Sequence, residues 1–390
     1  MPDSAAALVT EPRVPVNEPL LNGNEAAYVA ECVATGWVSS AGRFVDAFEE
    51  GWAAYCGRAH GVAVANGTVA LDAAIAALDL GPGDEVILPT FTIVSCAQAV
   101  VYAGATPVLV DADPETWAMD VDQLADRITP RTKAVMPVHI YGHPVDMDPL
   151  LALAERHGLA VIEDAAEAHG AEVLLDRDAP GGGTWHRCGS LGAVSTFSFY
   201  ANKILTTGEG GMVLTDDDAL AARLRSVRNL CFEPGRRFYH ERLGHNFRLT
   251  NLQAALGVAQ LERIDDALAH KRWMGRAYAE RLADVPHLQL HTERPWARSV
   301  HWMVGVVLHD DAPFDAEGFA AALLARGVET RPFFLGMHEQ PAFHARGLFA
   351  GERYPVAERL ARRGLYLPSG MTLTEDQLDR VVDAVREVLA

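Results

Sequence analysis

The sequence predicts an α/β fold, with a mainly parallel sheet in a large domain and a smaller α+β domain at the C-terminus. Between about residues 45 and 215, short and nearly continuous apolar runs alternate with stretches of helical periodicity. Strands that are apolar along their whole length are typical of parallel sheets covered by helices. At 390 residues the chain is long enough to form both domains.

Seven segments in this region have the length and apolar content of strands. They are residues 61–66, 85–89, 106–112, 134–139, 159–164, 194–199 and 211–216. Helical patterns such as 68–80 and 148–158 lie between most of them, so we expect a seven-stranded sheet that is mainly parallel. Ligands bind beyond the carboxyl ends of such strands. The polar residues near these ends are therefore site candidates: Asn66, Asp111, His139, Asp164 and Ser198.

A long helical pattern at 251–285 marks the change to the second domain. It is followed by a predicted strand, helix, strand and final helix, which occupy 301–310, 315–327, 328–334 and 374–390. Thr374 is suited to cap the last helix. We therefore expect a flexible tail at 1–14, a large domain at 15–262 and a small domain at 263–390.

Composition excludes several classes of function. The net charge of −19 argues against general binding to nucleic acid or to anionic membranes. No apolar run approaches the roughly 20 residues that span a bilayer, and the N-terminus lacks a secretory signal, so we expect a cytoplasmic protein. The five cysteines are scattered without a CxxC pair, which indicates neither a disulfide scaffold nor a zinc site.

Lys203 and Asp164 are the candidate catalytic residues. Only three of the 33 basic residues are lysines, and Lys203 alone lies between an apolar strand and a glycine-rich turn. Burial there would lower its pKa and favour the neutral amine that forms a Schiff base. Asp164 ends an apolar strand, where a carboxylate can either cap the next helix or face a cationic ring nitrogen.

The Asn66-Gly67-Thr68 segment is a candidate phosphate site, because it joins a strand to a helix whose N-terminal N–H groups favour an anion. A plain helix cap at Thr68 is the alternative. Ser198 would add a second hydroxyl. The chain has no GxGxxG after an early strand, no GxxxxGK[ST] and no HExxH, so nicotinamide-dependent oxidoreductases, P-loop proteins and zinc proteases lose their usual support.

From about residue 15 to its end, the chain resembles the DegT family of nucleotide-sugar aminotransferases. The resemblance is carried in order by LNGNEAAYV, TGWVSSAG, ANGTVALDAA, PGDEVILPTFT, GATPVLVDAD, VHIYGHPVDMD, VIEDAAEAHGA, FSFYANKILTTGEGGMVLTD, GHNFRLTNLQAALGVAQLERID, RPFF and LYLPSG. It implies the fold type I of pyridoxal-phosphate-dependent transferases, like that of aspartate aminotransferase. It also implies pyridoxal 5′-phosphate as the cofactor and a homodimer with shared active sites.

The resemblance implies a role for each matching residue. Lys203 would bind the cofactor covalently and later shuttle a proton, Asp164 would pair with the pyridine nitrogen, and Glu167 would lie near the ring hydroxyl. The phosphate would be held by Gly67, Thr68 and Ser198, joined by Asn246 of the partner subunit. Ile93 stands where the family often has an aromatic residue stacked on the ring, so apolar contact would replace stacking.

Four segments are most similar to the subgroup that aminates GDP-4-keto-6-deoxymannose with glutamate as donor: TGWVSSAG, DPETWAMD, EDAAEA and TTGEGGMV. Enzymes that aminate C3 of a 3-keto sugar, as for mycosamine, are the nearest alternative. A deoxysugar dehydratase of the same family would carry histidine in place of Lys203. A non-catalytic sensor would need an added binding module, which the sequence does not offer.

Overall fold

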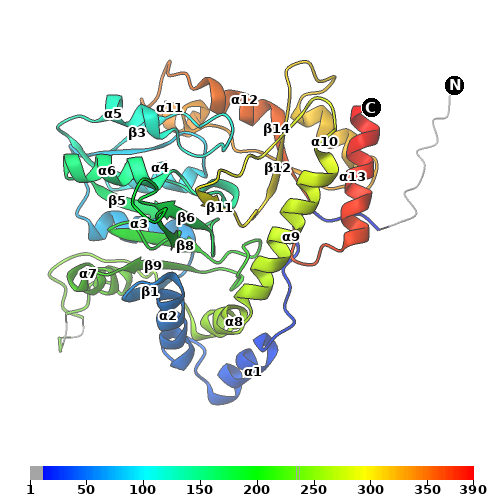
Figure 1. The fold of residues 1–390 in the computed structure, drawn as a ribbon. Coiled ribbons are helices and arrows are strands. Elements are labelled where there is room, and N and C mark those ends of the chain that lie inside the picture. Colours follow the sequence, from blue (N-terminus) through cyan, green and yellow to red (C-terminus); the bar gives the residue numbers. More distant parts are fainter. Residues whose placement is uncertain (1–11, 234, 237) are drawn as a thin grey trace.

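The computed structural model describes residues 12–233, 235–236 and 238–390. Its main feature is a seven-stranded sheet with the order β1-β9-β8-β5-β4-β2-β3 (Figure 1). The strands are β1 (His60–Val64), β2 (Glu85–Pro89), β3 (Thr106–Val110), β4 (Thr132–Val135), β5 (Ala160–Asp164), β8 (Val194–Ser198) and β9 (Gly211–Thr215). Strands β8, β5, β4, β2 and β3 run parallel to one another, and β9 is antiparallel to both β1 and β8. The predicted fold class and all seven strands are confirmed.

Helices accompany this sheet, and most of them pack on it, whereas α1 packs on α8. In chain order they are α1 (Glu25–Thr35), α2 (Arg43–Cys56), α3 (Gly67–Ala77), α4 (Val94–Tyr102), α5 (Leu124–Arg127), α6 (Met147–His157), α7 (Asp218–Arg228) and α8 (Asn251–Leu261). Helix α3 lies against β8 and β9, and buried alanines such as Ala70 and Ala74 allow this close approach. Its N-terminus is thereby fixed at the end of β8, which Ser198 closes.

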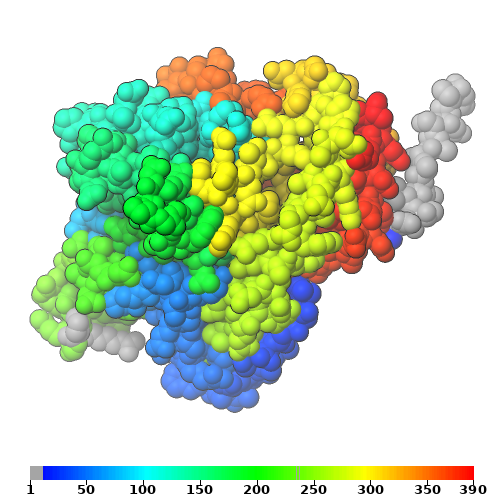
Figure 2. Space-filling model, in the orientation of Figure 1, coloured from blue at the N-terminus to red at the C-terminus, as the bar shows by residue number. Residues whose placement is uncertain are grey.

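A second sheet is antiparallel, with the order β10-β12-β14-β13. Its strands are β10 (Leu288–Leu290), β12 (Val304–Leu308), β13 (Arg331–Pro332) and β14 (Gly364–Leu367). The accompanying helices are α9 (Ile264–Leu282), α10 (Ala316–Leu324), α11 (Pro341–His344), α12 (Pro355–Arg363) and α13 (Glu375–Leu389). Helices α9 and α13 pack side by side, as the neighbouring yellow-green and red surfaces of Figure 2 show, around a core separate from that of the large sheet.

The structure differs from the predicted elements in several places. The helical pattern at 251–285 divides into α8 and α9, and the strand predicted at 328–334 shrinks to the two residues of β13. Strands β6 (Glu172–Leu175), β7 (Thr184–Arg187) and β11 (Ala297–Arg298), which form a third small sheet, were not predicted, nor were β10 and β14. The predicted domain boundary at 262/263 lies between α8 and α9 and stays a prediction.

Residues 1–11 of the predicted tail lie outside the described residues. The end of that tail was wrongly assigned, because Val14 is fully buried and forms a parallel bridge with Val328. Within the part of the chain that the structure describes, no helix combines the length and the apolar character that a membrane crossing requires.

Candidate active site

A cavity of about 270 Å³ opens at the carboxyl ends of β5 and β8, beside the N-terminus of α3. Seven of the eight predicted site residues line it: Gly67, Thr68, Ile93, Asp164, Glu167, Ser198 and Lys203. Three aromatic residues from the C-terminal part of the chain also line the cavity: Trp302, Phe334 and Tyr366. The sequence did not predict them as site residues. The structure therefore brings the predicted residues together at the expected edge of the sheet.

Lys203 lies in the turn after β8, where its backbone N–H donates to the Tyr200 carbonyl at 2.9 Å. Its side chain is 10% exposed, and its Nζ lies 3.8 Å from Oε1 of Glu167. Burial lowers the pKa of Lys203, while the nearby carboxylates of Glu167 and Asp164 oppose that shift. The predicted direction of this pKa is thus found in the structure, and it favours a more nucleophilic amine.

Asp164 is buried at the end of β5, and its carboxylate accepts two hydrogen bonds. The Ala166 N–H donates to Oδ1 at 3.0 Å, and the Cys96 thiol donates to Oδ2 at 3.2 Å. Burial raises the pKa of Asp164, whereas these hydrogen bonds and Lys203 lower it. The carboxylate both caps the following turn and lines the cavity, so the two functions weighed from the sequence are compatible.

Glu167 completes the group of ionisable side chains in the cavity. The Tyr141 N–H donates to its Oε2 at 2.8 Å. Desolvation raises the pKa of Glu167 to about 7, although the Lys203 amine lowers it. A carboxyl that titrates in this range can share a proton with a neighbouring amine near neutral pH.

The N-terminus of α3 has the features of an anion site. Asn66 caps the helix by accepting the Val69 N–H at 3.0 Å, and the Thr68 hydroxyl lies 2.8 Å from that of Ser95. A Cβ at Gly67 would lie 2.6 Å from Cβ of Ser198, so only glycine lets the helix start this close to β8. Free N–H groups and hydroxyls at a helix start suit a phosphate. Asn202 Oδ1, at the same cavity, is buried without a hydrogen-bond partner.

These residues fit pyridoxal phosphate, since an amine, a carboxylate and an anion site share one cavity. Ile93 lines that cavity at the N-terminus of α4 with 41% exposure. Asn246 is exposed, lies outside the cavity and forms a backbone bridge with Asn229. The single chain therefore does not bring Asn246 to the other site residues.

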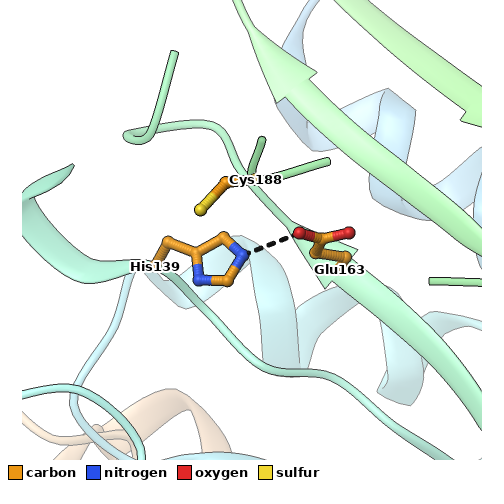
Figure 3. Close-up of side chains that lie close together, drawn as sticks. All are labelled: His139, Glu163 and Cys188. Carbon is orange, nitrogen blue, oxygen red and sulfur yellow. Dashed lines mark hydrogen bonds and ion pairs between the residues drawn. The ribbon is translucent and has the colours of Figure 1, made fainter. Parts of the chain in front are cut away.

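His139, Glu163 and Cys188 form a buried cluster outside the residues that line the cavity (Figure 3). His139 Nε2 lies 2.9 Å from Oε1 of Glu163, and the Val145 N–H donates to His139 Nδ1 at 3.0 Å. Glu163 also accepts N–H groups from the turn at 189–192. His139 was a site candidate because it follows β4, but one of its ring nitrogens bonds Glu163 and the other accepts the Val145 N–H, so neither is free for a ligand.

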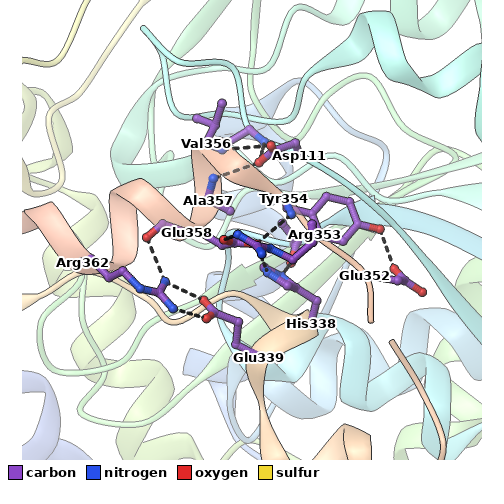
Figure 4. A network of polar contacts seen from close by, with 12 residues as sticks. Asp111, His338, Glu339, Glu352, Arg353, Tyr354, Val356, Ala357, Glu358 and Arg362 are labelled. Carbon is purple, nitrogen blue, oxygen red and sulfur yellow. Dashed lines mark hydrogen bonds and ion pairs between the residues drawn. The ribbon is translucent and has the colours of Figure 1, made fainter. Parts of the chain in front are cut away.

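Asp111 was a second strand-end candidate, and it too has a structural role. Its carboxylate accepts the N–H groups of Val356 and Ala357 at 3.0 and 2.9 Å, which joins the end of β3 to the start of α12 (Figure 4). In the same network, Nδ1 of the buried His338 lies 2.8 Å from the Thr90 hydroxyl at the end of β2. These contacts hold the C-terminal region over the strand ends, and neither Asp111 nor His338 lines the cavity.

Trp302, Phe334 and Tyr366 follow Lys203 by 99 residues or more. Trp302 is 4% exposed, and its ring faces the Lys203 amine with 3.8 Å from Nζ to the ring centroid. Phe334 lies within the quoted RPFF segment and Tyr366 within LYLPSG, so the motifs did mark their neighbourhood. Their position in the cavity depends on packing between two distant parts of the chain, which no local pattern encodes.

Comparisons with known proteins show which family the chain matches. Residues 19–386 match the DegT/DnrJ/EryC1/StrS aminotransferase family. The chain is 46% identical over 384 residues to GDP-perosamine synthase of Caulobacter vibrioides, covering 97% of this chain and 99% of that protein. It is 38% identical over 373 residues to GDP-perosamine synthase of Vibrio cholerae, covering 96% and 98%.

A solved structure of S. venezuelae DesV in complex with a ketimine intermediate matches with a TM-score of 0.85 and 36% identity, covering 97% of this chain and 98% of that one. The resemblance noted from the sequence is thereby confirmed along nearly the whole chain. The protein belongs to the DegT/DnrJ/EryC1/StrS aminotransferase family and is a sugar aminotransferase with the fold of the pyridoxal-phosphate-dependent transferases.

Proposed function

We propose that this protein converts GDP-4-keto-6-deoxymannose to GDP-perosamine, takes the amino group from L-glutamate, and binds pyridoxal 5′-phosphate through Lys203. One observation carries the proposal: the buried Lys203 amine faces the carboxylates of Glu167 and Asp164 in a cavity that also holds the N-terminus of α3. The substrate is supported by the full-length similarity to two proteins named GDP-perosamine synthase.

Each residue of the cavity has a defined task in this proposal. Pyridoxal phosphate supplies an electron-withdrawing ring that stabilises negative charge on a substrate carbon when a proton leaves it. Asp164 provides a buried negative charge that favours a protonated ring nitrogen. Gly67, Thr68 and Ser198 bind the phosphate, and Ile93 contacts the ring. The Lys203 amine takes up and returns the proton, and Glu167 can exchange a proton with that amine.

We further propose a cytoplasmic homodimer in which Asn246 of each chain reaches the phosphate site of its partner. The exposure of Asn246 outside its own cavity supports this arrangement. The residue at position 203 also bears on the alternatives, because the dehydratases of this family carry histidine there. A lysine favours amino transfer.

The substrate is tested by incubating the purified protein with L-glutamate and GDP-4-keto-6-deoxymannose and locating the new C–N bond by NMR. A bond at C4 supports the proposal. Amination of only a 3-keto nucleotide sugar, at C3, would contradict the substrate and leave the cofactor assignment intact. Loss of the sugar hydroxyl without gain of nitrogen would indicate a dehydratase.

The cofactor linkage is tested by borohydride reduction, which fixes an imine as a stable amine, followed by peptide mapping. Because the chain has only three lysines, the labelled peptide identifies the residue unambiguously. We expect the label on Lys203, no label and no turnover in Lys203→Ala, and normal labelling in the control Lys133→Ala, which alters an exposed lysine on β4. A label on Lys133 or Lys271 would refute the assignment.

A further inference from the structure

The Trp302 ring lies directly against the Lys203 amine. Its face lies 3.8 Å from Nζ, within the range of a cation–π contact, and its indole Nε1 donates to the Asn202 carbonyl at 2.8 Å. Asn202 is the residue before Lys203. The same side chain therefore contacts the reactive amine and ties down the turn that carries it.

The backbone at Trp302 is held in an unusual conformation. The preceding residue, His301, has a φ of 47°, which is rare for a residue with a side chain and is retained only where surrounding contacts enforce it. Gly142 makes room for this segment, since a Cβ there would lie 2.8 Å from the Trp302 backbone nitrogen. The Ser299 hydroxyl accepts the His301 N–H at 3.1 Å and donates to the Gly142 carbonyl at 3.1 Å.

Lys271 also restrains Trp302, through a hydrogen bond to its backbone carbonyl. It lies on α9, is 1% exposed, and donates from Nζ to the Trp302 carbonyl at 2.9 Å and to the Ser369 carbonyl. Desolvation lowers the pKa of Lys271 to about 7. Both protonation states keep at least two N–H donors, so both carbonyls can be bonded on either side of this pKa. A buried amine that meets only backbone carbonyls is costly, and this favours a specific role over general stability.

We propose that Trp302 holds the amine of Lys203 in place whenever that amine is free, and that Lys271 is the residue that positions Trp302 for this purpose. The inference rests on the proposed function, in which the Lys203 amine takes up and returns a proton and would therefore have to stay within reach of the substrate. The ring face attracts the ammonium form of the lysine and thus keeps a proton available at Nζ.

Other charged or titratable groups also face Lys203. They are Glu167 and Asp164, which favour its ammonium form, the Cys96 thiol, and His169, whose own pKa is lowered by burial and by Lys203. Trp302 differs from them because it has no titration of its own. Its removal therefore changes the Lys203 titration without adding or removing a charge.

The test is an NMR titration of the cofactor-free full-length protein labelled with ¹³C at Cε of lysine. The three lysines give three signals, which Lys→Arg substitutions assign. In Trp302→Leu we expect the pKa of Lys203 to fall, so that the neutral fraction of the amine at a fixed pH below that pKa rises about three- to thirty-fold. In Trp302→Phe, which keeps a ring face, we expect a smaller change.

Lys271→Met tests the positioning role, and Tyr278→Phe is its matched control. Tyr278 lies on the same helix, is fully buried, and donates from its hydroxyl to the Pro368 carbonyl at 3.0 Å, next to Ser369. We expect Lys271→Met to shift the Lys203 titration in the same direction as Trp302→Leu, and Tyr278→Phe to leave it unchanged. Equal shifts of the Lys203 titration in both variants would show that Lys271 only supports the fold, and would overturn its role in positioning Trp302.

The titration needs neither substrate nor turnover, so its failure is distinct from failure of the proposed function. An unchanged or raised Lys203 pKa in Trp302→Leu would overturn the role of Trp302 even in an active aminotransferase. Should Lys271→Met fail to fold, Trp302→Leu and Trp302→Phe still decide the central contact.

Discussion

The Cys96 thiol on α4 donates a hydrogen bond to the Asp164 carboxylate at the end of β5, with 3.2 Å between Sγ and Oδ2. This contact joins two residues that are 68 positions apart in the sequence, and it orients the buried acid. The hydrogen bond also lowers the pKa of Asp164 and so favours its negatively charged form.

Replacing Cys96 with alanine removes this donor, so the pKa of Asp164 should rise and its hold on a ring cation should weaken. We expect the affinity for pyridoxal phosphate to fall about three- to ten-fold, as for loss of one modest hydrogen bond. Absorbance titration with the cofactor measures this change. Cys96→Ser keeps a donor and should bind nearly as the unaltered protein does; equal losses in both variants would point to packing instead.

Glu167 should make the cofactor-free protein less stable as the pH rises. Its folded pKa of about 7 lies above the ordinary value of 4.5, so the folded state binds the extra proton and this stability is lost between about pH 4.5 and 7. Glu167→Gln should flatten the dependence of the unfolding free energy on pH by up to about 3 kcal/mol across that window. Denaturant unfolding at pH 5 and pH 8 checks this, and parallel curves for both proteins would contradict it.

Gly67→Ala should damage the anion site through a steric conflict. The added Cβ would lie 2.6 Å from Cβ of Ser198, so the start of α3 must move away from β8. We expect a stability loss of about 1–3 kcal/mol and a cofactor affinity reduced more than ten-fold. The double variant Gly67→Ala/Ser198→Gly removes the opposing atom and should recover most of the stability in thermal unfolding. No recovery would locate the damage elsewhere.

Glu163→Gln should destabilise the fold without touching the cavity. The carboxylate accepts hydrogen bonds from His139 and from the N–H groups of Gly189, Leu191 and Gly192. The NH₂ of a glutamine would face groups that are themselves donors, so one of these hydrogen bonds would be replaced by a donor–donor contact. We expect the free energy of unfolding to fall by about 2–4 kcal/mol. Thermal unfolding measures this cost. Cys188→Ala, in the same cluster, should cost less, and added chelator should leave the melting temperature of the unaltered protein unchanged.

The sequence predicted the large sheet and most of the candidate site because both follow from local patterns. Asp164 and Lys203 could be chosen from the strand that precedes each of them. Glu163 could not, although it is adjacent to Asp164. Alternation along β5 directs it to the opposite face, and its task became visible only with the turn at 189–192.

Features that depend on packing between distant segments were missed. Trp302 meets Lys203 only because α9 and the Ser369 region hold the backbone at 299–304. Asp111 looked like a ligand-binding residue, but it stabilises the start of α12 more than 240 residues later. The break between α8 and α9 involves Glu262 and Arg263, neither of which is a helix-breaking residue, so no local signal marked it.

The burial of Val14 has a practical consequence for shortening the protein. Beyond its bridge to Val328, the same segment accepts the Ser369 N–H at the Val16 carbonyl, at 2.9 Å, and places the Asn17 amide 3.4 Å from the Asn202 carbonyl. An N-terminal truncation that removes Val14, Val16 and Asn17 would therefore delete contacts to three distant segments, one of which, at Asn202, immediately precedes Lys203. Trimmed variants need a check of catalysis as well as of solubility.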